Sequence, residues 1–138
     1  MKSLERFITA QHDSYEQALS EIKGGRKTSH WMWYIFPQIK GLGHSDTAKY
    51  YALQNTLEAE NYLNHPVLGK RLIEISSTLL KHQGKTANEI FGYPDDLKLH
   101  SSMTLFSLLP NSDPVFDNVL LAYFNGIGDQ KTIEICSA

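Results

Sequence analysis

The feature that most constrains this chain is a stripe of apolar residues that recur every three or four positions. Leu68, Leu72, Ile75 and Leu79 have this spacing, which places their side chains on one face of an α-helix. β-Branched residues are scattered, and no segment of strand-like length alternates between apolar and polar residues. The pattern therefore predicts an all-α fold.

Capping signals divide the chain into helices of modest length. Asp13, Ser45, Asn55 and Thr86 each precede a helical pattern, and their side chains suit the N-cap position. In three of these four cases a glutamate follows three residues later, which is the spacing of a capping box. We expect about eight or nine short-to-medium helices, packed as a compact single all-helical domain over residues 1–138.

Composition and charge narrow the range of functions. The formal net charge of −2 argues against bulk electrostatic capture of nucleic acid. No apolar run approaches the roughly 18 residues that cross a bilayer, and Glu5 and Arg6 stand where a signal peptide would need its apolar core. Cys136 is the only cysteine and cannot form an internal disulfide. We therefore expect a cytoplasmic protein without a membrane partner.

The histidines and the cysteine do not suggest a metal centre. No two of the six histidines lie three or four residues apart, and one cysteine is too few for a zinc-binding motif. The motifs of serine hydrolases and of phosphate-binding P-loops do not occur either. We therefore predict no metal site and no cofactor.

A basic loop follows the glycine pair that ends an early helix, on whose solvent face we place Glu21. Arg26 and Lys27 supply two cations, and Thr28 and Ser29 suit the cap position of the next helix. The N-terminus of a helix offers N–H groups and the positive end of a dipole to an anion. The loop therefore predicts an anion-binding site, with Ser29 as a hydrogen-bond donor.

Both tryptophans of the chain lie directly after this loop. Trp33 offers a flat face to a planar ring or to a cation, and Gln38 adds an amide a few residues later. His30 precedes the pair, and because an imidazole can give or take a proton near neutral pH, His30 is our candidate catalytic residue. The residues of this stretch that we expect in the core are Trp31, Met32, Ile35 and Phe36.

A later helix, expected over residues 95–109, carries polar side chains on its apolar face. At about 100° per residue, Lys98, Ser101 and Ser102 fall within the arc of its leucines. Buried serines often bond to the preceding turn, and a lysine can extend past apolar neighbours to water. The same three groups could instead bind a ligand. The apolar arc comprises Leu97, Leu105, Leu108 and Leu109, and the opposite face comprises His100, Thr104 and Ser107.

Gln11 breaks the apolar pattern in a similar way. It lies in line with Leu4, Phe7 and Ile8 on the first helical stripe. A buried amide without partners would cost roughly 1–3 kcal/mol, so Gln11 needs a partner. It is either a core amide that bonds to other parts of the protein or a ligand-binding residue.

Several uninterrupted runs of residues match one family along nearly the whole chain. The most specific are Ser29-His30-Trp31-Met32-Trp33, Ile35-Phe36-Pro37-Gln38 and Lys98-Leu99-His100-Ser101-Ser102. Through them the chain resembles the bacterial family known as domain of unknown function 1810, some members of which are labelled calpastatin. The resemblance implies a compact all-helical domain and no particular reaction. A calpastatin would be an unstructured protease inhibitor, which does not fit a chain with so many caps and apolar stripes.

Together the polar residues predict a pocket for a small anionic, nucleotide-like ligand. The protein would bind such a ligand, or act on it as a hydrolase or transferase with His30 as the acid or base. The hypothesis requires His30 and Lys98 to line one cavity. The predicted ligand-binding residues are Gln11, Arg26, Lys27, Ser29, Trp33, Gln38, Lys98, Ser101 and Ser102.

The alternative is a non-catalytic protein-interaction module that docks a partner through the aromatic stretch 26–38. A flat, exposed surface formed by Trp31 and Trp33 would favour the module, whereas a concave site with converging polar groups would favour the ligand. Nucleic-acid binding is a weaker third hypothesis, because the net charge is negative and no recognition motif occurs.

Overall fold

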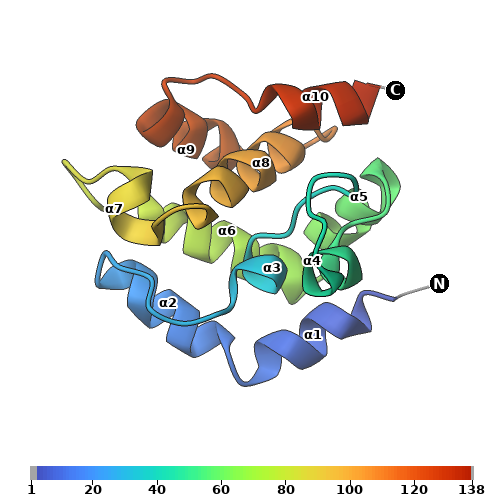
Figure 1. Ribbon diagram of the computed structural model, residues 1–138, viewed down its shortest axis with the longest axis horizontal. Helices are drawn as coiled ribbons and strands as arrows, with labels where there is room; N and C mark the ends of the chain where they lie inside the picture. The colour runs from blue at the N-terminus through green and yellow to red at the C-terminus, as the bar shows by residue number, and fades with distance from the viewer. Residues whose placement is uncertain (1–2, 138) are drawn as a thin grey trace.

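The structure is a computed structural model that describes residues 3–137, so residues 1, 2 and 138 of the expected domain lie outside the described part (Figure 1). The described residues form ten α-helices and no strand, apart from an isolated bridge between Ile39 and Leu53. The all-α prediction is confirmed, and the number of helices is slightly higher than predicted. The helices are α1 (Glu5–His12), α2 (Tyr15–Lys23), α3 (Met32–Ile35), α4 (Asp46–Tyr51), α5 (Thr56–Asn64), α6 (Leu68–Leu79), α7 (Ala87–Phe91), α8 (Asp95–Ser107), α9 (Val115–Phe124) and α10 (Gln130–Ser137).

Helix α8 lies among the other helices, and α1 and α2 run along the lower edge of the molecule in this view (Figure 1). It contacts α5, α7, α9 and α10, and every residue from Ser101 to Phe106 is buried. Helix α6 packs against α2, α5 and α9. The short helix α3 lies between the α1–α2 edge and α8, so it is placed centrally although it is a single turn (Figure 1).

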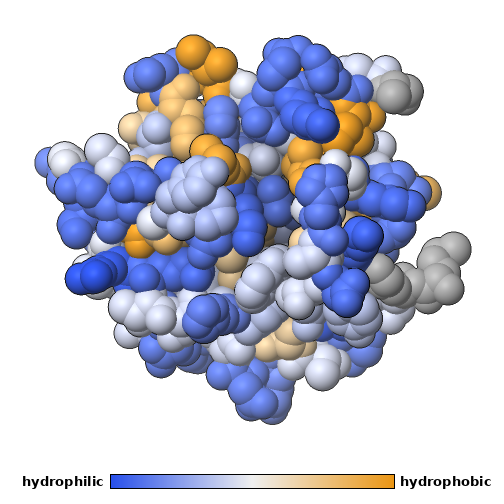
Figure 2. Space-filling model, viewed as in Figure 1, coloured by the Kyte–Doolittle hydropathy of each residue, from blue (hydrophilic) through white to orange (hydrophobic). Residues whose placement is uncertain are grey.

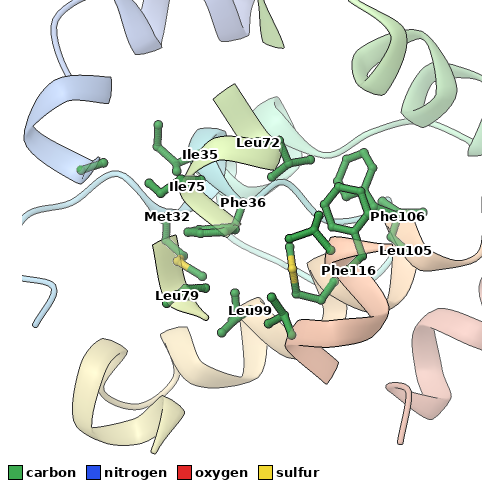
Figure 3. Close-up of a cluster of buried hydrophobic side chains, with 14 of the residues drawn as sticks. Met32, Ile35, Phe36, Leu72, Ile75, Leu79, Leu99, Leu105, Phe106 and Phe116 are labelled. Atoms are coloured by element: carbon green, nitrogen blue, oxygen red, sulfur yellow. The ribbon is translucent and has the colours of Figure 1, made fainter. Parts of the chain in front are cut away.

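The core joins α3, α6, α8 and α9. Figure 3 shows that Met32 and Ile35 from α3, and Phe36 directly after it, lie in the same apolar cluster as side chains from the other three helices. The stripe predicted for α6 is confirmed, because its four residues are at most 1% exposed. Burial of such side chains is the main favourable contribution to folding.

Three of the four predicted caps are confirmed. The side chains of Ser45 and Asn55 accept hydrogen bonds from the N–H groups three residues later, and Thr86 forms a complete capping box with the glutamate three residues later. The prediction for Asp13 is wrong. Helix α1 runs as far as His12, so Asp13 lies at its C-terminal end, and α2 follows Ser14 without a side-chain cap.

The surface that faces the viewer in Figure 2 is mostly hydrophilic, and its apolar residues gather over α10 and the loop before it. Leu121 and Ile127, which are 68% and 66% exposed, are the most exposed large aliphatic residues of the described chain. Among residues 3–137, no helix combines the length and apolar character that crossing a membrane requires.

Candidate functional site

The aromatic stretch has a buried part and a half-buried part. Trp31, Met32, Ile35 and Phe36 are at most 2% exposed, which confirms the core prediction. Trp33, in contrast, is half-buried. Because Trp31 is buried, the two tryptophans do not form the flat exposed surface that would have favoured an interaction module.

The carboxylate of Glu21 fills the predicted anion site in the loop before α3. Its Oε1 accepts hydrogen bonds from the backbone N–H groups of Thr28 (2.7 Å) and Ser29 (3.0 Å). The same oxygen accepts a bond from the indole N–H of Trp31 (2.9 Å). Oε2 accepts bonds from the Ser29 hydroxyl (2.6 Å) and the Gln17 amide (2.8 Å). The chain thus supplies its own anion at this point.

Two expectations about this loop are therefore wrong. Glu21 is buried rather than exposed, because its hydrogen bonds compensate for the loss of water around the carboxylate. Thr28 and Ser29 bind Glu21 instead of capping α3, which begins at Met32 and has no side-chain cap. Burial alone would raise the pKa of Glu21, but the hydrogen bonds from Ser29 and its other donors outweigh this effect and lower the pKa to about 2.

Asp95, the first residue of α8, brings two of the predicted cations together. Its carboxylate lies 2.8 Å from Nζ of Lys27 and 3.4 Å from Nζ of Lys98. The Lys27 ammonium is 5.0 Å from the centre of the Trp31 ring, and the Lys98 ammonium is 5.0 Å from that of Trp33. Both distances allow a cation–π interaction. Lys27 and Lys98 thus meet around a carboxylate that was not predicted from the sequence, and Lys98 also contacts Trp33.

Arg26 and His30 lie at the surface. Their side chains form no hydrogen bond or ion pair with other residues in the described range. The recorded partners of the Lys98 ammonium are Trp33 and Asp95. The presence of His30 and Lys98 in one cavity, which the ligand hypothesis required, therefore stays a prediction.

Gln11 lies in the core, with 1% of its surface exposed. Its Nε2 donates hydrogen bonds to the carbonyl oxygen of Tyr34 (2.8 Å) and to the hydroxyl of Tyr62 (3.0 Å). Its Oε1 accepts one from Nη1 of Arg71 (3.3 Å). These bonds join α1 to α3, α5 and α6 and give the amide the internal partners that a core residue needs.

The polar residues predicted on the inward arc of α8 have different surroundings. The Ser101 hydroxyl donates to the carbonyl oxygen of Leu97 (3.1 Å) and contacts Oδ2 of Asp129 (3.3 Å), next to α10. The predicted apolar arc is partly wrong, because Leu97 and Leu108 are 51% and 47% exposed, whereas Thr104 is 1% exposed. Helix α8 is enclosed by other helices over much of its surface, so a single apolar stripe does not describe its burial.

Ser102 has the one buried side-chain oxygen or nitrogen without a hydrogen-bond partner in residues 3–137. Replacing Ser102 with alanine is expected to increase stability by about 1 kcal/mol, because an unpaired buried hydroxyl costs roughly 1–3 kcal/mol. The matched variant Ser101→Ala removes a hydroxyl that has partners, so its stability is expected to fall by about 1 kcal/mol. Urea denaturation measures both effects, and equal losses in the two variants would contradict the assignment.

A cleft lies beside the loop that follows α3. It has a volume of about 310 Å³, and its lining includes the basic residues Lys40, His44 and Lys49. These three residues were not predicted from the sequence. A signal was available, since Gly41 and Gly43 stand among basic residues here, in a pattern similar to the one that drew attention to the loop at Arg26 and Lys27.

A narrower space adjoins this cleft, because Gly43 and Ala52 line both. Its volume is about 10 Å³. Two predicted ligand-binding residues, Trp33 and Gln38, line the narrower space together with Tyr51. The basic cleft and the half-buried tryptophan are therefore neighbours.

The fold and the cleft define a small all-helical protein with basic side chains beside a half-buried tryptophan. The chain belongs to the family described as protein of unknown function (DUF1810), whose model matches residues 1–136. The family resemblance seen in the sequence is thereby confirmed. The chain is also similar to the conserved hypothetical protein Rv1873 from Mycobacterium tuberculosis, known from a crystal structure, with 42% identity and a TM-score of 0.96. The match covers 98% of this chain and 96% of that one. No curated protein matches the chain.

Proposed function

We propose that the cleft binds a small anionic ligand that carries a planar ring, as a nucleotide does. The supporting observation is that Lys40, His44 and Lys49 line a cleft. Trp33 and Tyr51 line the space that adjoins it. Ligand sites commonly combine a concave apolar surface with a few polar groups. Because the whole chain has a net charge of −2, the basic groups at the cleft are a local concentration and not a general property of the surface.

Each group has a separate role in this proposal. Lys40 and Lys49 bind the anionic part of the ligand, because ammonium groups are point donors for phosphate oxygens. Trp33 packs against the ring, and Gln38 forms a hydrogen bond to its edge. Lys98 orients Trp33 through the contact of its ammonium with the indole. Hydrolysis or group transfer, with His30 as acid or base, is a separate hypothesis.

In this proposal the anion binds at the cleft and not at the loop of residues 26–29. Lys27 and Lys98 already share the carboxylate of Asp95, and the N–H group of Ser29 already bonds to Glu21. A ligand would have to displace these internal partners. Lys40 and His44, in contrast, are exposed at the cleft.

Replacing Lys40 or Lys49 with alanine is expected to weaken binding of a nucleoside diphosphate about tenfold, which corresponds to about 1.4 kcal/mol per lost ionic contact. Isothermal titration with ADP at one fixed salt concentration measures the change, since ionic contributions depend on salt. Pyrophosphate and adenosine, titrated separately, report the anionic and ring parts of the ligand.

The matched control is Lys23→Ala, which removes an exposed lysine at the end of α2 and should leave the affinity unchanged. The proposal would be contradicted if neither ADP nor pyrophosphate bound at millimolar concentration. It would equally be contradicted if Lys40→Ala and Lys49→Ala both bound ADP as tightly as the unmodified protein.

A further inference from the structure

Residues 41–49 leave the body of the protein and return to it close to the point of departure. The bridge between Ile39 and Leu53 joins the two sides at the base of this segment. The N–H group of Lys40 donates to the carbonyl oxygen of Leu53 (2.8 Å), and that of Leu53 donates to the carbonyl oxygen of Gln38 (2.9 Å). The base of the segment is therefore fixed by backbone hydrogen bonds.

Arg6 holds the returning side of the same base. Its guanidinium group donates to the carbonyl oxygens of Tyr50 (2.9 Å) and Ala52 (3.0 Å). The guanidinium also forms an ion pair with Glu58 at 3.1 Å, and its side chain is 3% exposed. Both ends of the segment are thus attached to well-buried parts of the protein.

The segment itself adds no fully buried side chain to the core, although the half-buried Leu42 packs against it. Helix α4, which makes up much of it, has no buried residue, and every residue from 40 to 50 is exposed or half-buried. It packs closely on itself, because a Cβ atom built on Gly43 would lie 2.5 Å from the Cβ of Ala48. A segment with firm ends and few buried contacts can separate from the body at a low cost in free energy.

The segment also forms one wall of the narrow space beside Trp33. Gly43 and Ala48 line that space from the segment, and Trp33 and Gln38 line it from the body. Its volume of about 10 Å³ is about that of one water probe and is far too small for an aromatic ring. If Gly43 and Ala48 move outward, this space merges with the cleft of about 310 Å³ that Gly43 also lines.

We propose that residues 41–49 are a flap that closes over Trp33 and opens to admit the ring of the ligand. The identity of the ligand rests on the proposed function, whereas the opening is a property of the protein alone. Gly41 lies at the base of the flap with φ of +109°. Glycine adopts this backbone conformation readily and other residues do not, so the flap can change direction there.

The variant Gly43→Ala tests the flap without any ligand, because its new methyl group would meet Ala48, which is also in the flap, and would loosen the closed conformation of the flap. Hydrogen exchange, followed by mass spectrometry, should become at least tenfold faster across residues 41–49 and stay unchanged in α6. In the Ala48→Gly background the opposing methyl group is gone, so the same substitution should change exchange less than twofold. The comparison isolates the contact between the two positions.

Quenching of tryptophan fluorescence by acrylamide gives a second measurement. Trp31 is 1% exposed, and the Trp33→Phe variant supplies its background signal. Quenching of Trp33 should increase at least twofold in Gly43→Ala. Unchanged exchange and quenching in this variant would overturn the flap, as would a parallel loss of protection in α6.

Exchange in the unmodified protein decides the question even if Gly43→Ala does not fold. Flap amides should exchange at least 100-fold faster than those of α6, and equal protection of the two would overturn the proposal. ADP should slow flap exchange at least fivefold, whereas pyrophosphate, which has no ring and contacts the flap only through its basic side chains, should slow it less. If neither compound binds, the proposed function fails, and the measurements without ligand still decide whether the flap exists.

Discussion

Replacing Gly69 with alanine is expected to destabilise the protein by about 3 kcal/mol or more, at the upper end of what overpacking causes. A Cβ atom built on Gly69 would lie 1.8 Å from the carbonyl oxygen of Leu63 and 2.7 Å from its carbonyl carbon. Both are backbone atoms of α5, so no side-chain rotation can relieve the overlap. The two helices would have to separate where α5 and α6 pack together.

Urea denaturation measures this effect, with Gly24→Ala as the matched control. Gly24 ends α2 with φ of −75°, and a Cβ atom there would meet its nearest neighbour at an ordinary 3.5 Å. The free energy of unfolding of the control should stay within about 0.5 kcal/mol of the value for the unmodified protein. If the free energy of unfolding of Gly69→Ala fell by less than about 1 kcal/mol, α5 and α6 would be able to move apart easily.

Replacing Glu21 with glutamine is expected to cost roughly 3 kcal/mol at neutral pH, by conversion of its pKa shift to free energy. The hydrogen bonds to the carboxylate lower the pKa from 4.5 to about 2, so the ionised form is the one that stabilises the folded state. This contribution is complete above the unfolded-state value and disappears as the pH falls toward the folded-state value. The stability difference between the two proteins should therefore shrink between about pH 5 and pH 2.

Denaturation curves recorded across this pH range test the prediction. Glu16→Gln is the matched control, because Glu16 is exposed on the same helix and should change stability by less than about 0.5 kcal/mol. A cost for Glu21→Gln that does not depend on pH would mean that the lost charge is not its cause. The variant should also loosen the loop at residues 28–31, since Glu21 binds both its backbone and the Trp31 indole.

The helices were largely predictable because their signals are local. The caps at Ser45, Asn55 and Thr86 are hydrogen bonds within one turn, so spacing in the sequence is enough to find them. The capping box at Asp13 failed although its spacing is correct. Helix α1 continues as far as His12, which leaves Asp13 at a C-terminal end, so a capping pattern alone does not decide where a helix starts.

The candidate site was predictable only in part, because its groups come from distant places in the chain. Trp33 and Gln38 stood out in one unusual stretch, and they line the space beside the cleft. Glu21 and Asp95 carry no such signal, since an acidic residue on a helix normally faces water. Their burial and ion pairing depend on residues brought near by the fold, which periodicity and capping patterns do not report.

The position of α8 also determines when the protein can acquire its structure during synthesis. Trp31 packs against Phe91, just before α8, and Lys27 pairs with Asp95 at its first turn. A ribosome produces the N-terminal helices first, so these side chains exist for some time without their partners. The segments before α8 therefore leave the ribosome as an incomplete unit, with their apolar faces open to chaperones until the later helices arrive.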